Sequence, residues 1–457
     1  MIIPHTQLII DDNLRIPPSD VYDVTLTTSI WSLTPTLSFK LKDQTGARFA
    51  KLHILIGSVI RIAIVDADMS AHNEVVPLEN SPNNGLSDND RENIEKLYWV
   101  KPNEDTDFIP TTFVVKEFFN AFEYSAPNAG FIQVNCVQSW NFYLEKKNSG
   151  YRGKISEIIK EVLKNSNSHN GIKKDSLDDS ELFSSSSDDG EVIRHSAGIC
   201  DKEFIEKNLV PYLNVNGEPG YFFIDAFGNA RCTNLSKLEN ANVKALGFIR
   251  AGLKDKDNEQ LADMLNSSGA DFKFPIDSIK CALGQTDNIS GLINSSSFIR
   301  VGTTLNTMGG TLQEDYITSD RTFNSGKGKF VVPISRRNFF ACHASEYNFN
   351  PYWCCDTDKN LLRINAAKGT EKRVLAEIET GYISNTLKVG DVIQLYGAYA
   401  GDEYYWIRGK WTIGRIEYHI EKDMRGADIR DSMKITIFRR GIPADEKSSI
   451  QLVGYLT

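Results

Sequence analysis

The sequence of 457 residues has little cysteine, no long hydrophobic run and no basic leader at its N-terminus. Its seven cysteines are an odd number, widely spaced in a chain long enough to fold without disulfides, which is typical of free thiols made in a reducing compartment. The longest apolar stretch, Ile54 to Val65, is interrupted by Arg61 and is too short to cross a bilayer. The first residues turn acidic at Asp11 and Asp12, unlike a signal peptide. We therefore expect a protein made in the cytoplasm, with no membrane insertion.

Basic residues are also in deficit. The 51 Lys and Arg residues are outnumbered by 60 Asp and Glu residues, which gives a formal net charge of -9. A general nucleic-acid binder needs a clear basic excess, so this composition argues against that class of protein. The hydrophobic fraction of 41% and the charged fraction of 24% are typical of globular proteins. The length predicts two to four domains.

Motifs of the common enzyme classes are missing as well. The sequence has no G-x-S-x-G elbow, no H-E-x-x-H, no phosphate-binding G-x-x-x-x-G-K and no C-x-x-C. Cys342-His343 and Cys354-Cys355 could offer four zinc ligands, but adjacent residues do not easily point into one tetrahedral site, so we interpret them as ordinary thiols. Asp66-Ala67-Asp68 and Asp188-Asp189 lack the ligand spacing of a calcium loop. We predict no catalytic, cofactor-binding or metal-binding residue.

Two aromatic clusters leave alternatives open. His419 lies in a predicted strand beside Trp411 and Tyr418, and no nucleophile or orienting carboxylate can be assigned to it. We predict a hydrogen-bonded structural histidine. The aromatic residues 404–406, together with Trp411, could form a platform that stacks on sugars. In alternating strands, such residues more often lie in a core or at a subunit interface.

Strand patterns mark both ends of the chain. Residues 1–150 form the first predicted domain, with strand-favouring stretches at 21–66 and 97–140 on either side of a polar loop at 70–93. Residues 330–457 return to the same pattern and form the last predicted domain. Residues 241–329 are rich in Gly, Asn and Ser, and we interpret them as a mixed domain or insertion with a helix near 261–265.

The middle of the chain, residues 151–240, predicts a small α/β domain. Its first helix shows apolar residues at i, i+3, i+4, i+7 and i+8, namely Ile155, Ile158, Ile159, Val162 and Leu163. A second helix is predicted over 201–212, and Gly228-Asn229 marks the turn of a hairpin. The Ser- and Asp-rich stretch 166–198 has too few apolar residues to offset its ordering entropy, so we predict a flexible, disordered insertion there.

One short pattern occurs twice. Residues 57–62 and 390–395 both follow G-x-V-I-x-[IL], and both lie in β-rich regions after an apolar stretch. Chance similarity between strands is the plain explanation. A tandem pair of similar β-barrels would place such a strand in each copy.

The order of several such landmarks resembles the central baseplate hub family of contractile phage tails. That family includes the late-control tail proteins and the N-terminal part of type VI secretion spikes. Its members commonly close with a strand that contains glycine, tryptophan and histidine, followed by a strand that ends in Arg-x-Gly. The similar stretches here are Ile30–Pro35, Tyr151–Ile159, Val389–Ile393, Tyr405–Ile413, Ile416–His419 and Ile435–Gly441. The stretches 70–93 and 166–198 depart from the family.

The resemblance implies a β-rich α+β fold with two tube-type β-barrel domains and smaller α/β domains between them. It implies a homotrimer whose six barrels join the six-fold tail tube to the three-fold spike and line the DNA exit channel. The implied partners are the tail tube protein and the central spike protein, with tape measure and baseplate wedge proteins as further candidates. The implied location is the virion tail baseplate, assembled in the host cytoplasm, and the protein would not be an enzyme.

Two other functional classes stay open, a tail-associated peptidoglycan hydrolase and a receptor- or glycan-binding tail protein. The charge yields a further expectation. DNA must pass the channel without specific binding, so its lining should be acidic or neutral, with basic residues toward subunit interfaces. The alternative is that the negative charge is spread evenly over the exterior and only keeps the protein soluble.

Overall fold

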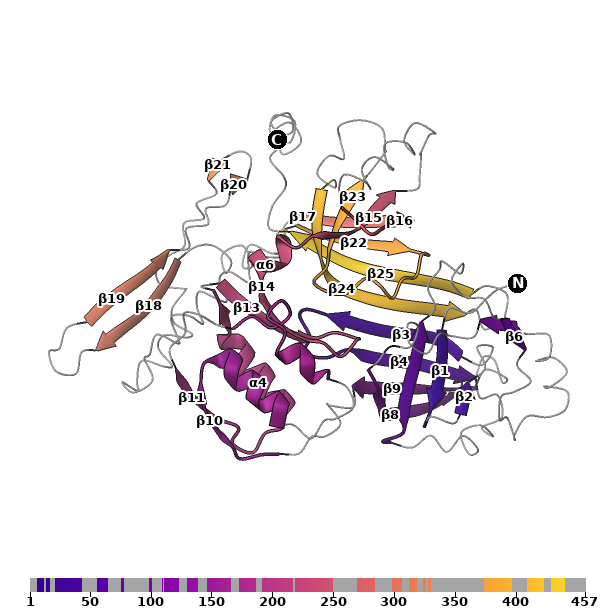
Figure 1. Ribbon diagram of the computed structural model, residues 1–457, viewed down its shortest axis with the longest axis horizontal. Helices are drawn as coiled ribbons and strands as arrows, with labels where there is room; N and C mark the ends of the chain where they lie inside the picture. The colour runs from indigo at the N-terminus through magenta and orange to yellow at the C-terminus, as the bar shows by residue number, and fades with distance from the viewer. Residues whose placement is uncertain are drawn as a thin grey trace.

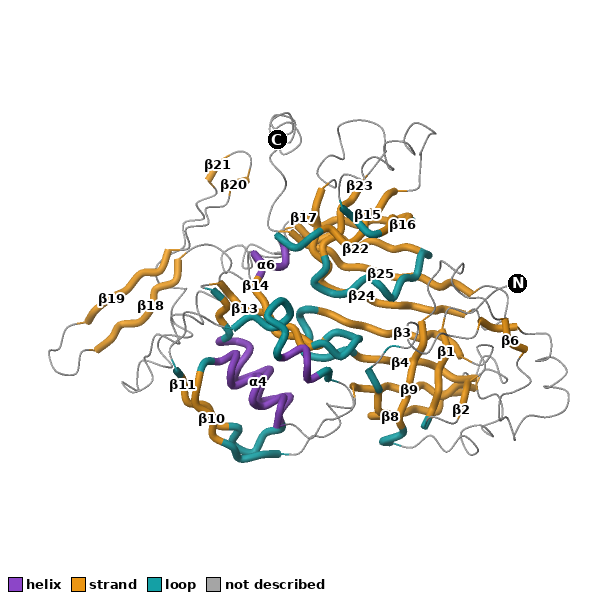
Figure 2. Tube along the Cα trace, viewed as in Figure 1, coloured by secondary structure: helices purple, strands orange, loops and turns teal. Residues whose placement is uncertain are grey.

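The chain is β-rich and contains few helices (Figure 2). The computed structural model describes residues 6–11, 14–16, 21–42, 56–64, 75–77, 98–100, 109, 111–122, 130–138, 146–165, 172–185, 191–216, 218–249, 269–283, 298–305, 312–318, 324–325, 328–329, 374–396, 409–422 and 429–439. The predicted helix near 261–265, the two Asp pairs and the Cys/His pairs at 342–343 and 354–355 lie outside these residues.

A 14-stranded sheet combines strands from both ends of the chain (Figure 1). Its path runs β16-β15-β23-β24-β3-β4-β9-β8-β5-β1-β2, and β25 joins it through β24 and β22, with β17 beside β22. The strands are β1 (Thr6–Ile10), β2 (Leu14–Ile16), β3 (Val21–Ser29), β4 (Thr36–Lys42), β5 (Val59–Ile64), β8 (Phe113–Phe122), β9 (Gly130–Gln138), β15 (Val243–Ile249), β16 (Phe272–Ile276), β17 (Ser278–Leu283), β22 (Val374–Thr380), β23 (Val392–Tyr396), β24 (Gly409–Lys422) and β25 (Ile429–Arg439).

This sheet takes in strands from outside the predicted first and last domains. Strands β15, β16 and β17 come from the stretch 241–329 that the sequence marked as mixed, yet they pair with β22 and β23 in the same sheet. The strands of the second β region therefore start at Val243 in this sheet. The described strands of neither region close on themselves into a barrel.

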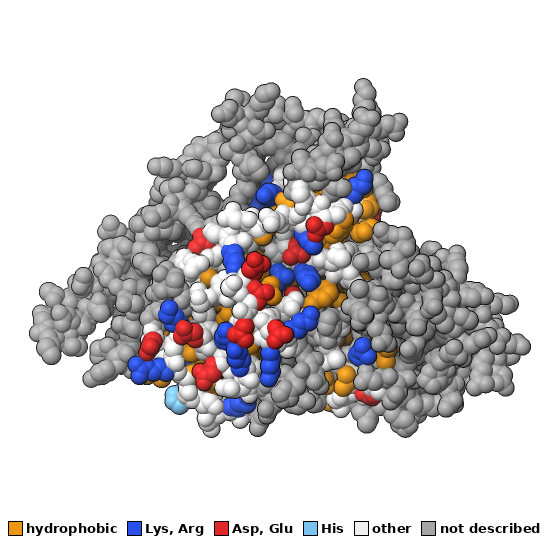
Figure 3. All heavy atoms as spheres, in the orientation of Figure 1, with side chains coloured by type: hydrophobic (Ala, Val, Ile, Leu, Met, Phe, Trp, Pro, Cys, Tyr) orange, Lys and Arg blue, Asp and Glu red, His pale blue; other side chains and the backbone are white. Residues whose placement is uncertain are grey.

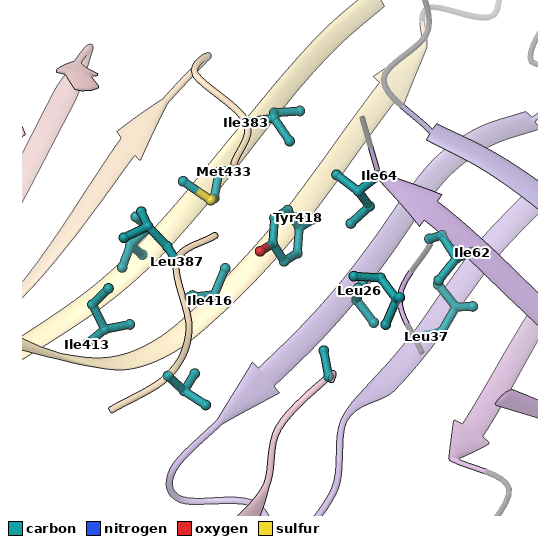
Figure 4. Close-up of a cluster of buried hydrophobic side chains, with 14 of the residues drawn as sticks. Leu26, Leu37, Ile62, Ile64, Ile383, Leu387, Ile413, Ile416, Tyr418 and Met433 are labelled. Atoms are coloured by element: carbon teal, nitrogen blue, oxygen red, sulfur yellow. The ribbon is translucent and has the colours of Figure 1, made fainter. Parts of the chain in front are cut away.

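Alternation along the strands produces the core. In β9 the burial alternates at every residue, as expected for a sheet with one covered face. The apolar faces of the two β regions meet in one large buried cluster that includes Leu26, Ile62, Ile416 and Tyr418 (Figure 4). One continuous core therefore fixes the two regions against each other.

The middle domain has its own core and confirms the predicted helix and hairpin. Helix α4 (Ile155–Asn165) buries all five apolar residues that the periodicity selected. The hairpin around Gly228-Asn229 consists of β13 (Glu218–Ile224) and β14 (Ala230–Asn234). The helical stretch predicted over 201–212 is α5 (Asp201–Phe204), a π-helical turn η5 (Ile205–Leu209) and a 3-10 turn η6 (Val210–Tyr212). Strand β10 (Gly150–Gly153), strand β12 (Asn214–Val215) and helix α6 (Leu235–Glu239) also belong to this part of the chain.

The Ser- and Asp-rich stretch differs from the prediction of a disordered insertion over 166–198. Its described parts, residues 172–185 and 191–198, pack on the middle domain. Leu177, in the 3-10 turn η4 (Lys174–Leu177), and Phe183 are both buried in that core. Strand β11 (Val192–His195) pairs with β10 along its whole length. A few apolar anchors and a paired strand therefore stabilise a stretch whose average composition predicts disorder.

Three small hairpins complete the described elements. Strands β6 (Val75–Pro77) and β7 (Tyr98–Val100) pair across the predicted polar loop 70–93, so that loop contains a short strand. Strands β18 (Phe298–Leu305) and β19 (Leu312–Thr318) pair with each other, as do β20 (Asn324–Ser325) and β21 (Gly328–Lys329).

Candidate functional site: two matching β units and their junction

The repeated G-x-V-I-x-[IL] pattern marks two equivalent places in the sheet. Gly57 and Gly390 both have positive φ, at 97° and 86°, and each lies two residues before a strand. The Gly57 N–H donates to the Val115 carbonyl at 2.9 Å, and the Gly390 N–H donates to the Ile413 carbonyl at 2.8 Å. A return hydrogen bond is also present in both places. The Val115 N–H donates to the Ser58 carbonyl, and the Ile413 N–H donates to the Asp391 carbonyl. The pattern is therefore a structural repeat and not a chance similarity.

The strands beside these glycines also match. Val59 of β5 pairs with Val114 of β8, and Val392 of β23 pairs with Thr412 of β24. Each longer strand then has a register shift at the same point, between Val115 and Glu117 in β8 and between Ile413 and Arg415 in β24. Lys116 and Gly414 are therefore equivalent bulge residues. A bulge bends a strand and increases its twist, so the two copies curve alike.

The match extends over five strands in each copy. We call β3, β4, β9, β8 and β5 the first β unit, and β17, β22, β25, β24 and β23 the second β unit. Strands β9 and β25 pair antiparallel with β4 and β22, which in turn pair antiparallel with β3 and β17. The order and the strand directions are the same in both units. The match ends at the next strand, because β1 pairs antiparallel with β5 whereas β15 pairs parallel with β23.

The two units are joined edge to edge by one antiparallel ladder. After the bulge, residues 415–420 of β24 pair with residues 29–24 of β3. The buried Tyr418 hydroxyl donates to the Ser384 carbonyl at 3.0 Å, which ties this ladder to the loop before β23. At the bulge, a Cβ on Gly414 would lie 2.2 Å from Cη2 of Trp31, whose ring packs 5.5 Å from that of Phe438. The junction therefore needs a residue without a side chain at position 414.

The opposite face of the sheet carries polar and charged side chains of both signs. Lys40 forms an ion pair with Asp23 at 2.6 Å, and the Asn135 amide donates to Glu117 Oε1 at 3.1 Å. Arg415 pairs with Glu417 on the same strand. The Lys40–Asp23 and Arg415–Glu417 pairs each join opposite charges, whereas Glu117 is held by a neutral amide.

His419 on this face is hydrogen-bonded, as the sequence predicted. Its Nδ1 lies 3.1 Å from Thr25 Oγ1 and 3.8 Å from Asp23 Oδ1. Both neighbours approach the same ring nitrogen, whereas a catalytic triad needs the carboxylate and the nucleophile on different nitrogens. Trp411 is 1% exposed and Arg439 covers its ring at 4.0 Å, so it cannot stack on a sugar. Residues 404–406 lie outside the described residues.

A charged cluster fastens the middle domain to the second β unit. Arg231 on β14 donates to the Val389 carbonyl at 3.2 Å and lies 3.5 Å from Asp225 and 3.8 Å from Asp391. Burial raises the pKa of Asp391, although Arg231 acts in the opposite direction. Burial lowers the pKa of Lys388, whose ammonium lies 4.4 Å above the Phe227 ring. The Arg231 hydrogen bond to the Val389 carbonyl therefore ties the middle domain directly to the second β unit.

The outer surface of the middle domain also mixes charges of both signs (Figure 3). Asp178 contacts Lys160 at 2.7 Å and Lys164 at 3.1 Å, and hydrogen bonds from these two lysines lower its pKa. Lys207 pairs with Glu203 at 2.8 Å one helical turn away. These pairs lie on solvated surface and stabilise the fold little.

The described part of the chain contains no group of three or more His, Cys, Asp or Glu side chains that could hold a metal ion. Cys136, Cys200 and Cys232 are free thiols and are buried. Burial raises the pKa of the Cys136 and Cys232 thiols, the latter to about 12, which makes them poor nucleophiles. None of the described helices is long and apolar enough to cross a membrane.

The repeated sequence pattern marks one strand in each β unit, β5 and β23. The other matching strands share alternation and register but no sequence pattern, because any apolar residue satisfies an inward position. The spacing of the pattern was the available signal. The junction between β24 and β3 joins residues almost 400 positions apart, and no local pattern predicts it.

Comparisons with known proteins show the fold. No protein-family model matches the sequence, and no curated protein matches it. Among solved structures, the 43 kDa tail protein of prophage MuSo2 from Shewanella oneidensis is similar with a TM-score of 0.50, 10% sequence identity and coverage of 95% of this chain and 98% of that one. A tail protein from Neisseria meningitidis MC58 has a TM-score of 0.47, 6% identity and coverage of 96% and 97%. The Francisella PdpA-VgrG complex has a TM-score of 0.43, 7% identity and coverage of 96% and 59%. The chain therefore has, over nearly its whole length, the fold of a prophage tail protein.

Proposed function

We propose that this chain is a structural hub of a contractile tail baseplate, in which three copies form a ring. The observation that carries the proposal is the pair of matching five-stranded β units in one chain. Each unit would be one tube-type barrel domain, completed by its neighbouring strands. The likeness to a prophage tail protein supports a structural role of this kind.

A ring of three chains with two units each has six similar positions on one face. Such a ring fits a six-fold tail tube on that face and a three-fold spike on the other. The middle domain, β18 and β19 belong to each chain only once, so they repeat three times around the ring and suit the three-fold partner. The chain would act as a symmetry adaptor between tube and spike, with no catalytic step of its own.

The polar face of the sheet would line the central channel. Two of its described cations lie in ion pairs, Lys40 with Asp23 and Arg415 with Glu417, which leaves their charges less available to DNA phosphates. A protein that grips DNA neutralises phosphates with Lys and Arg and releases counterions. A lining with balanced charge would let DNA pass without specific binding.

Electron microscopy of the purified protein tests this proposal. We expect ring-shaped particles with six densities around a central channel in views along the axis. In the same preparation, purified peptidoglycan should release no soluble fragments, which separates a structural hub from a tail-associated hydrolase. Single particles without a ring at high concentration, or release of peptidoglycan fragments, would contradict the proposal.

A further inference from the structure

We propose that β8 of one chain pairs antiparallel with β17 of a second copy, in a single defined register. The expected pairs are Phe119 with Ala282, Asn120 with Cys281, Ala121 with Lys280, and Phe122 with Ile279. This inference rests on the proposed ring of chains and adds the strands and the register that close it.

One half of this contact is the later part of β8. The ladder between β5 and β8 covers only Phe113 and Val114. Beyond the bulge, β8 continues to pair with β9 as far as Phe122, and in the described part of the chain no strand continues the β5 side. Phe119 is 52% exposed there, a large apolar side chain in contact with solvent in the single chain. A long exposed edge of this kind is a ready template for another strand.

The other half of the contact is β17. It pairs with β22 on one side, and the described strands place nothing on its other side. Its counterpart in the first β unit, β3, has strands on both sides, β4 and β24. Figure 1 places β8 and β17 on opposite sides of the chain, so they cannot meet within one copy.

The junction inside the chain supplies the template. Strand β24 is the counterpart of β8, and β3 is the counterpart of β17. Within the chain, β23 pairs only with the first part of β24, and β3 pairs with the part of β24 beyond the bulge. The equivalent edges of the two β units are β8 and β17. The same ladder, formed between one copy and the next, would join them. Such a head-to-tail contact closes into a ring when the rotation is right.

The register follows from the shared neighbours of the strands. Tyr418 and Asn120 occupy the same position, because their partners Met433 and Ile132 are equivalent. Leu26 pairs with Leu37 of β4, and Cys281 pairs with Ala376 of β22. Leu37 and Ala376 are equivalent through their pairing with β9 and β25, so Leu26 is equivalent to Cys281. Within the chain Tyr418 pairs with Leu26, so between chains Asn120 should pair with Cys281.

Native Cys281 makes the register testable by a single substitution. Directly opposed residues in an antiparallel ladder have Cα atoms about 4.5–5.5 Å apart, a separation that a disulfide can span. Mild oxidation of the assembled Asn120→Cys variant should therefore give a covalent trimer on a non-reducing gel. Addition of Cys281→Ser should abolish it. The matched control is Lys116→Cys, an exposed residue of the same strand whose counterpart Gly414 has no partner in β3, and it should give no link to Cys281.

A second pair guards against loss of folding in one variant. Ala121→Cys with Lys280→Cys and Cys281→Ser should link in the same way, and circular dichroism should show unchanged strand content. Trimers that form by mass yet show neither link would overturn the register and leave the proposed hub intact. If both disulfides form but join many copies into open chains, the strand pairing would be supported and the trimeric hub contradicted. A chain that stays monomeric in every variant would overturn both.

Discussion

Substitution of Gly414 by alanine should weaken the junction between the two β units. The added Cβ would lie 2.2 Å from Cη2 and 2.8 Å from Cζ2 and Cζ3 of Trp31. Carbon atoms in contact are roughly 3.5–4.0 Å apart, so the Cη2 contact is more than about 1 Å too short. The backbone of Gly414 is not in the left-handed region, so the cost is steric and not conformational. Overpacking of this kind costs about 1–3 kcal/mol. Urea unfolding followed by circular dichroism measures it.

The repeat provides a matched control for this prediction. Lys116 is the equivalent bulge residue of the first β unit and is exposed, so Lys116→Ala should change the free energy of unfolding by less than about 0.5 kcal/mol. If the Trp31 ring is the cause, Gly414→Ala should cost almost nothing in a Trp31→Ala background. An equal cost in both backgrounds, or a Gly414→Ala variant as stable as Lys116→Ala, would refute the steric explanation.

Three further predictions concern other parts of the chain. Burial raises the pKa of Asp391, so its ionised form costs stability at neutral pH. Asp391→Asn should be at least as stable as the wild type at pH 7. The difference in stability should vanish as the pH falls below about 4, the pKa of Asp in the unfolded chain. Urea unfolding at pH 7 that shows lower stability of the variant would contradict this. Phe183→Ala should cost about 3 kcal/mol, because the ring is buried against Phe222, and a neutral effect on thermal unfolding would restore the flexible-insertion interpretation. Maleimide labelling of native protein, followed by peptide mapping, should spare the buried Cys136, Cys200 and Cys232. Fast labelling of any of these three would contradict their burial.

Local signals predicted local structure well. The helix at Ile155 and the hairpin at Gly228 depend on periodicity and on turn residues that act within a few positions. The stretch 166–198 was predicted wrongly in its described parts, because composition averages over the anchors Leu177 and Phe183, and two such contacts can order a polar segment. Strands β15 to β17 lie before the boundary expected at Phe330, and they pair in the same sheet as β22 and β23.

The candidate site was predicted only at its two glycines. Gly57 and Gly390 were visible because a positive φ restricts the residue type. The bulges at Lys116 and Gly414 carry different residues, because one faces solvent and the other faces the Trp31 ring. The junction is a pairing between distant strands, and its register depends on the whole sheet.

The number of chains per assembled particle tests the central proposal most directly. Native mass spectrometry over a range of concentrations should show one species with three times the mass of the chain, since two β units per chain must supply six. A stable monomer throughout, or a closed assembly of any other number of chains, would contradict the proposed hub.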